Sequence, residues 1–202
     1  MPRPHSDVTQ GADRDEPGAP APEARHAALS ILAAMRRLLL MRHGKSDWDA
    51  PYGTDHDRPL AARGERAART MGRVLQRMGE VPETMLSSSA VRARATAELA
   101  RVSGGWPCPL TIDDGLYGTG AHETLHIAAA QGGDAERLML VGHEPTWSDL
   151  TGLLTGARAH VKTATVVGID LYIDSWLDAP NATGVLAYLL NPRMFTDGEW
   201  VL

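Results

Sequence analysis

Residues 36–46 read RRLLLMRHGKS, so an apolar run leads directly into Arg42, His43 and Gly44. An apolar run of this length that is closed by glycine is typical of a buried strand followed by a loop. Buried strands of this kind build parallel sheets, and open α/β sheets bind ligands beyond the carboxyl ends of their strands. We therefore expect Arg42 and His43 to lie at a functional edge of a sheet. Taken alone, a solvated arginine and a capping histidine at a strand end are an equally good interpretation.

The side chains at the end of this run suit phosphate chemistry. The planar guanidinium of an arginine such as Arg42 matches the geometry of phosphate oxygens. A neutral histidine such as His43 is a nucleophile near pH 7. Gly44 permits a backbone turn and the close approach of a ligand. The stretch therefore contains a candidate site for a phosphorylated ligand.

The composition is that of an ordinary globular protein. The chain has 202 residues, 43% of them hydrophobic, which is enough for one domain with a sizeable core. Its net charge of −5 gives no electrostatic case for a nucleic-acid partner. Cys108 is the only cysteine, which excludes an internal disulfide and a cysteine-based metal cage and fits a reducing compartment. No apolar run reaches the ~18 residues of a membrane span, and no secretory signal is recognisable, so we expect a cytoplasmic protein without a membrane partner.

The first 34 residues differ in composition from the rest of the chain. They are rich in proline, alanine, glycine and acidic residues up to about residue 26, and such a segment buries too little apolar surface to order itself. We expect residues 1–34 to form a disordered tail and residues 35–202 to form one domain. Met35 stands just before the first predicted strand and is an alternative start codon. The sequence leaves open whether the tail is translated in the native protein.

Strands and helices are predicted to alternate after this tail. Apolar periodicity predicts helices over 61–78, 90–102, 121–131 and 146–155, and further strands over 84–87, 110–112, 138–141, 163–173 and 185–190. The serine cluster at 87–89 is expected to cap the second of these helices. The alternation predicts an α/β fold with three layers, α/β/α, around a mostly parallel central sheet.

Three of the predicted strands end in groups that bind phosphate. The strand that begins at residue 36 ends at Arg42 and His43, and the strand over 138–141 leads to His143. The strand over 84–87 ends in the serine cluster at 87–89, and Arg92 is expected about one turn into the helix that follows. The N-terminal N–H groups of this helix would also attract an anion. If neighbouring strands bring these ends together, two arginines and two histidines converge on one crevice. Such a crevice suits a transferring phosphoryl group, because its catalysis consists mainly of positioning and electrostatic stabilisation.

The three motifs resemble those of the histidine phosphatase superfamily, which also contains the cofactor-dependent phosphoglycerate mutases. The Arg-His-Gly signature is present at 42–44 and continues through Lys45, Ser46 and Trp48. A serine-rich helix start with Arg-Ala matches 88–93, and Gly-His-Glu-Pro at 142–145 matches the second histidine motif. The resemblance extends over about 36–195 and implies the phosphoglycerate mutase-like fold. The segments between the motifs leave no room for a large cap domain.

Two further phrases resemble the SixA-type phosphohistidine phosphatases in particular. They are Arg-Pro-Leu at 58–60, followed by Arg63 and Gly64, and Gly-Leu-Tyr at 115–117. The resemblance implies a metal-independent phosphatase without a cofactor. Its substrate would be phosphohistidine of a protein or a small phosphate ester, and an uncapped crevice would suit a phosphorylated protein side chain.

The resemblance also implies a role for each residue of the core. His43 would attack phosphorus and become a phosphohistidine, and water would then release phosphate. Arg42, Arg92 and His143 would hold the phosphoryl oxygens. No metal is expected, because these arginines and histidines supply the positive charge.

The general acid and the remaining substrate contacts are less well determined by the sequence. Glu144 follows His143 directly and is our choice for the acid, although an acidic residue at a helix N-terminus has an equally good structural explanation. Its rivals are Asp113, Asp114 and Glu123. We also expect Ser46 and Lys45 to contact substrate, with a loop cap and a solvated loop charge as the respective alternatives.

One motif points to a different class of enzyme. Residues 122–126 read HETLH and match the H-E-x-x-H pattern, in which His122 and His126 would bind zinc and Glu123 would act as a base. A zinc-dependent hydrolase is therefore the alternative function. The absence of a clear third ligand at a familiar spacing counts against it.

Overall fold

The central sheet has six strands in the order β3-β2-β4-β1-β5-β6. The computed structural model describes residues 35–196, 199 and 200, so the predicted tail of residues 1–34 lies outside the described residues. The strands of the sheet are β1 (Arg36–Arg42), β2 (Thr84–Ser88), β3 (Leu110–Asp113), β4 (Arg137–Gly142), β5 (Val166–Leu171) and β6 (Gly184–Leu190). Only β5 runs against the others, since it pairs antiparallel with both β1 and β6. The prediction of a mostly parallel sheet is confirmed.

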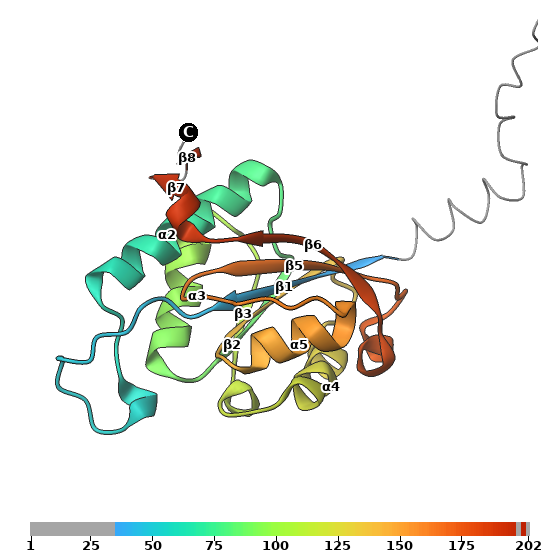
Figure 1. Cartoon of the computed structure of the whole chain (residues 1–202), viewed down its shortest axis with the longest axis horizontal. Helices are drawn as coiled ribbons and strands as arrows, with labels where there is room; N and C mark the ends of the chain where they lie inside the picture. Colours follow the sequence, from blue (N-terminus) through green and yellow to red (C-terminus); the bar gives the residue numbers. More distant parts are fainter. Residues whose placement is uncertain (1–34, 197–198, 201–202) are drawn as a thin grey trace, which may run out of the picture. The chain divides into compact units, whose positions relative to one another are not determined.

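Helices cover both faces of this sheet, as Figure 1 shows. One layer consists of α2 (Ala62–Met78) and α3 (Val91–Gly104), and the other consists of α4 (Ala121–Gln131) and α5 (Thr146–Thr155). Four short 3₁₀ helices, η1 (Asp55–Asp57), η2 (Asp114–Leu116), η3 (Trp176–Asn181) and η4 (Pro192–Met194), lie in the connections. A small ladder of β7 (Phe195–Thr196) and β8 (Glu199–Trp200) follows β6. The predicted α/β/α layers are confirmed, and no inserted cap domain occurs in the described residues.

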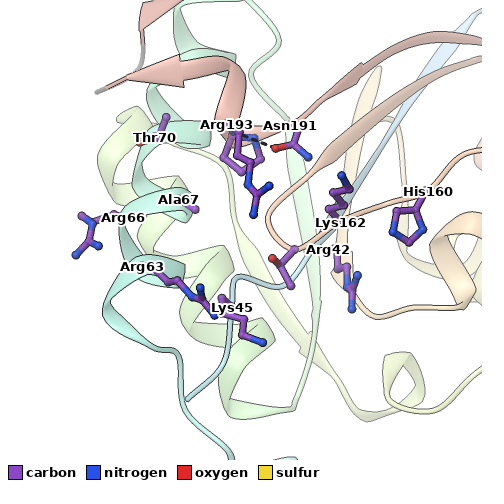
Figure 2. A pocket seen from close by; sticks show the side chains of 12 residues that line it. Arg42, Lys45, Arg63, Arg66, Ala67, Thr70, His160, Lys162, Asn191 and Arg193 are labelled. Carbon is purple, nitrogen blue, oxygen red and sulfur yellow. Dashed lines mark hydrogen bonds between the residues drawn. The ribbon is translucent and has the colours of Figure 1, made fainter. Parts of the chain in front are cut away.

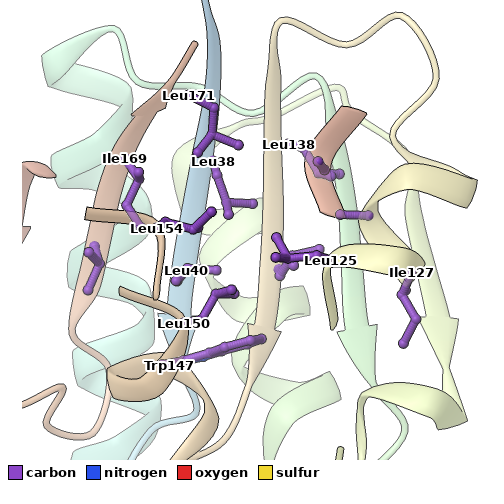
Figure 3. Close-up of a cluster of buried hydrophobic side chains, with 14 of the residues drawn as sticks. Leu38, Leu40, Leu125, Ile127, Leu138, Trp147, Leu150, Leu154, Ile169 and Leu171 are labelled. Carbon is purple, nitrogen blue, oxygen red and sulfur yellow. The ribbon is translucent and has the colours of Figure 1, made fainter. Parts of the chain in front are cut away.

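The apolar run in β1 is buried from both faces. Leu38, Leu39, Leu40 and Met41 have no exposed surface, because helices pack on both sides of the sheet. Leu38 and Leu40 belong to the core beneath α4 and α5, where Trp147, Leu150 and Leu154 pack against them (Figure 3). Leu39 and Met41 belong to the opposite core, beneath α2 and α3. Burying one such side chain contributes about 1.5–3 kcal/mol, so this run anchors the strand that carries Arg42 and His43.

Two glycines let backbones approach each other closely near the end of β1. A Cβ at Gly64 would stand 2.2 Å from the backbone oxygen of Lys45, so the loop after β1 lies directly against the first turn of α2. A Cβ at Gly72 would stand 2.1 Å from the backbone oxygen of Ala100, so α2 and α3 also touch along their backbones. These contacts fix the loop after His43 and the helix α3 relative to the sheet.

Some details differ from the sequence-based expectations. The serine cluster does not supply the N-cap of α3, which is Ala90 and has no side-chain cap hydrogen bond. Ser88 is the last residue of β2 and directs its hydroxyl to His143 instead. Arg92 is the second residue of α3 rather than a full turn into it. Ser88 therefore belongs to the crevice rather than to the helix.

The described part of the chain contains no helix with the length and apolarity needed to cross a membrane.

Candidate active site

The carboxyl ends of β1, β2 and β4 converge on one crevice. Because β1 and β4 pair in parallel with Arg42 opposite Gly142, His43 and His143 follow the two strands at the same level. Their ring centroids are 5.1 Å apart. Arg92 approaches them from the first turn of α3, which follows β2. The structure thus brings together all four residues that the sequence predicts for the core of the site.

His43 is held in one tautomer. Its Nδ1 atom lies 2.7 Å from the backbone oxygen of Gly44. A carbonyl oxygen only accepts hydrogen bonds, so Nδ1 carries the proton and Nε2 keeps its lone pair. Burial lowers the pKa of His43 to about 3. The hydrogen bond to Gly44 opposes this shift, whereas His143 and the positive charges of Arg92 and Arg42 reinforce it. His43 is consequently a neutral imidazole with a free Nε2 at neutral pH.

His143 faces the same crevice and is also neutral. Its Nε2 lies 2.9 Å from the hydroxyl of Ser88. Burial, followed by the positive charge of Arg92, lowers the pKa of His143 to about 4. A neutral histidine in this place can donate one hydrogen bond to a phosphoryl oxygen without adding a full charge.

Arg92 is almost fully buried, with 5% of its surface exposed. It donates from Nη1 to the backbone oxygen of Asp55 at 2.5 Å and from Nη2 to the carboxylate of Asp55 at 2.9 Å. Its Nε is buried and has no hydrogen-bond partner among the described residues. A buried donor without a partner costs about 1–3 kcal/mol, so this atom is available to an anionic ligand.

Arg42 presents a similar unpaired donor. Its Nη1 donates to the backbone oxygen of Val161 at 2.9 Å, which fixes the guanidinium beside the crevice. Its Nε is buried without a partner within the described part of the chain. Burial lowers the pKa of Arg42, and the carboxylate of Glu144 opposes that effect. Arg42 and Arg92 thus each have a buried N–H free to bind an oxygen atom.

Sequence reasoning missed the group of side chains that surrounds Arg92. Asp55 in η1 bonds both Arg92 and Arg58, and hydrogen bonding from Arg58 lowers the pKa of its carboxyl group. Tyr117 lies edge-on to His143, with ring centroids 5.4 Å apart, and its hydroxyl lies 3.3 Å from the Asp55 carboxylate. His56 packs edge-on against the same tyrosine at 4.9 Å. The Arg-Pro-Leu phrase at 58–60 and the Gly-Leu-Tyr phrase at 115–117 were the available signals, but they assigned no role to Arg58 or Tyr117.

The other sequence-predicted contacts fall in different places. Ser46 is buried and accepts a hydrogen bond from Arg58, so its hydroxyl is engaged within the protein. Lys45 lines a cavity that also contains Arg42. Substrate contacts by these two residues stay predictions.

The candidates for the general acid are now distinguished by their surroundings. Glu144 is half-buried, one of its carboxylate oxygens has no hydrogen-bond partner among the described residues, and burial raises its pKa. Asp113 accepts from the backbone N–H of Gly115 at 2.7 Å and from the side chain of Gln131, so its oxygens are engaged. Asp114 and Glu123 are exposed. Glu144 is therefore the carboxyl group best prepared to carry a proton.

The H-E-x-x-H segment lies on α4, and His122, Glu123 and His126 are exposed. The part of the chain that the structure describes contains no group of three or more histidine, cysteine or acidic side chains arranged to hold a metal ion. Two exposed histidines on one helix do not make a zinc site with the usual three protein ligands.

Comparison with known proteins agrees with this geometry. The model of the histidine phosphatase superfamily (branch 1) matches residues 38–152. The chain belongs to the histidine phosphatase superfamily. The match includes Arg42, His43, Arg92 and His143, and it makes a phosphatase acting on a phosphorylated substrate the general function of this chain. The zinc-dependent alternative is not favoured.

Relatives and solved structures place the chain within the superfamily. It is 39% identical to an uncharacterised protein of Mycobacterium tuberculosis over 160 residues, which are 79% of this chain and 92% of that protein. It is 31% identical to an uncharacterised chloroplastic protein of Arabidopsis thaliana over 162 residues, 76% of this chain and 74% of the relative. A structure assigned as phosphohistidine phosphatase SixA from Nakamurella multipartitia matches with a TM-score of 0.68 and 30% identity, covering 78% of this chain and 96% of that one. This histidine phosphatase is thus of the SixA type.

The lowered pKa values of the two histidines give a testable pH dependence. Free histidine titrates near pH 6.5, whereas His43 and His143 are expected to take up protons only near pH 3 and pH 4. Below pH 6.5 the unfolded chain therefore binds more protons than the folded one, so the free energy of unfolding should fall on acidification through this window. NMR titration should show that these two imidazoles do not titrate above pH 5. Midpoints close to 6.5 for both rings would contradict the assigned burial.

Proposed function

We propose that this chain is a metal-independent phosphatase that works through a covalent phosphohistidine at His43. The observation that carries the proposal is a neutral His43, its Nδ1 proton fixed by Gly44 at 2.7 Å, close enough to Arg42 and Arg92 for their charges to lower its pKa. The Nε groups of both arginines are buried without a partner among the described residues. A nucleophile with a free lone pair therefore stands beside donors for the oxygens of the group that it attacks. Covalent catalysis of this kind splits one difficult displacement into two easier ones.

The first step forms the phosphoenzyme. The Nε2 lone pair of His43 attacks phosphorus, a P–N bond forms, and the bond from phosphorus to the leaving oxygen or nitrogen breaks. Arg42, Arg92 and His143 donate to the phosphoryl oxygens, where charge is spread in the transition state. The leaving group takes up one proton.

The second step releases phosphate. A water molecule attacks phosphorus, the P–N bond to His43 breaks, and the water gives up a proton to the group that protonated the leaving group. His43 regains its lone pair at Nε2, and inorganic phosphate leaves. Arg42, Arg92 and His143 carry out the same stabilisation in both steps, because the transferring group stays in place.

We propose that Glu144 donates the proton that the leaving group takes up. Burial raises the pKa of Glu144, so its carboxyl group keeps a proton to a higher pH than usual. Glu144→Gln should lower kcat by about 10²-fold or more for an alkyl phosphate, whose leaving alkoxide needs a proton. The loss should be much smaller for a phosphoramidate, because a leaving imidazole needs less help. Steady-state kinetics on both substrates checks the difference. Equal losses on the two would contradict the assignment.

The substrate class that follows is a phosphomonoester or a phosphoramidate, either phosphohistidine of a protein or a small phosphate ester. The SixA-type structures support phosphohistidine of a protein as the substrate. The lone pair and the donors described above fit both, since each substrate presents the same terminal phosphoryl group.

The experiment that tests metal independence is the hydrolysis of an aryl phosphate in excess chelator. Activity is expected to be the same with and without chelator, because the side chains alone supply the positive charge. Restoration of a lost activity by added zinc would instead favour the His122 and His126 site. The control is a known zinc phosphatase treated identically.

A further inference from the structure

A basic cavity of about 620 Å³ lies beside the catalytic crevice. It is bounded by α2, by residues 160–163 before β5, and by residues 191–193 after β6. Six lysine and arginine residues line it, and no aspartate or glutamate does. These six cations are Arg42, Lys45, Arg63, Arg66, Lys162 and Arg193. The charge of the whole chain is −5, so this cavity has the opposite sign to the molecule.

Among the described residues, the six cations of this cavity form no ion pairs with acidic side chains. The ion pairs of the described residues use arginines elsewhere, including Arg37, Arg94 and Arg137. Arg42 feels the charge of Glu144, but the pair is not in salt-bridge contact. Lys45 and Lys162 are the only lysines of the chain, and both lie here. Like charges collected around a hollow repel one another, and their field attracts an anion.

The cavity and the crevice share Arg42. Figure 2 shows Lys45 and Arg63 on one side of the hollow, Lys162 and Arg42 on the other, and Arg193 extending between them. The charge of Arg42 also lowers the pKa values of His43 and His143, so it lies close to both histidines. A molecule whose phosphoryl group is held by Arg42 can therefore extend into the cavity.

We propose that the substrate is a small molecule with a second phosphate group, which the basic cavity binds while the first is transferred to His43. This inference rests on the proposed function. Several cations converge on one hollow, and arginine forks match phosphate oxygens in pairs. A volume of about 620 Å³ lies in the range of small-molecule sites. The hollow is open to solvent on one side, and its volume suits a compact bisphosphate.

The test measures binding separately from catalysis. In the His43→Ala variant, which cannot form the phosphoenzyme, calorimetry compares fructose 1,6-bisphosphate with fructose 6-phosphate. The bisphosphate should bind at least about tenfold more tightly, the effect of one good charge-assisted contact. Arg193→Gln and Lys162→Gln, each added to that background, should each reduce this ratio severalfold. Arg94→Gln removes the same charge from α3 outside the cavity and should leave the ratio unchanged.

The outcomes separate the two proposals. Equal binding of both sugar phosphates, with aryl phosphate hydrolysis intact in the wild type, would overturn the second-phosphate site and leave the phosphatase assignment standing. A preference that survives in both cavity variants, or falls equally in Arg94→Gln, would also overturn it. Cavity variants that impair only the dephosphorylation of a phosphohistidine protein would assign the cavity to a protein partner and contradict the proposal.

Discussion

His43→Ala is expected to lower the rate of aryl phosphate hydrolysis by several powers of ten. The variant loses the atom that bonds to phosphorus, and removal of a covalent nucleophile typically has an effect of about that size. Binding of phosphate should persist, because Arg42 and Arg92 keep their free donors. The measurement is kcat for the same substrate, with circular dichroism to confirm that the variant folds.

A matched control is available on α4. His122→Ala and His126→Ala each remove an exposed histidine of α4, and both should retain wild-type activity. The covalent mechanism would be wrong if His43→Ala kept most of its activity. Loss of activity in the two α4 variants, together with sensitivity to chelator, would move the chemistry to a metal site.

Arg92→Ala is expected to lower kcat by about 10²- to 10³-fold, comparable to the loss of one preorganised donor to a developing charge. The variant loses the buried Nε donor and also releases Asp55, which Arg92 holds through its Nη2 at 2.9 Å. A second, independent readout is available. The charge of Arg92 lowers the pKa values of His43 and His143, so both should rise in the variant.

The control for this prediction is Arg94→Ala, two residues along the same helix. Arg94 is half-exposed, and its one ion pair among the described residues is with Glu98 at 3.9 Å, which contributes little on a surface. Its loss should change kcat by less than about threefold. If Arg92→Ala behaved like Arg94→Ala in rate and in histidine titration, Arg92 would not contact the transferring group.

The sequence was sufficient to predict that the four candidate residues of the core lie close together, because each stands at the end of a buried strand or shortly after it. The apolar runs of β1 and β4 predict buried strands of a parallel sheet, and the pairing of β1 with β4 in the structure brings His43 and His143 to the same edge. Arg92 could be included among the candidates because it follows a predicted strand, and the structure shows that this strand, β2, pairs with β4. Strand ends are thus predictable from local patterns, without knowledge of any side-chain contact.

The environment of these residues could not be predicted in the same way. Asp55 comes from an irregular connection, and its contacts with Arg58, Arg92 and Tyr117 join three separate segments. No periodicity marks such a residue, because its position depends on how the loop folds back over α3. The position of Tyr117 was equally hard to predict, since this residue follows a 3₁₀ turn after β3.

The basic cavity could not be predicted from the sequence for a further reason. Lys45, Lys162 and Arg193 are far apart in the chain and meet only because β5 runs antiparallel beside β1 and β6 follows it. The sequence predicts strands over these regions but not their order in the sheet. Clustering of charges across three connections is therefore visible only in the folded structure.

The most direct test of the central claim is to trap the phosphoenzyme. Wild-type protein is mixed with a radiolabelled phosphoryl donor, quenched with base within milliseconds, and digested for mass spectrometry. We predict one phosphoryl group on Nε2 of His43, in a linkage that is labile to acid and stable to base, and none in His43→Ala. Rapid hydrolysis with no label at His43, or with label on another residue, would contradict the account.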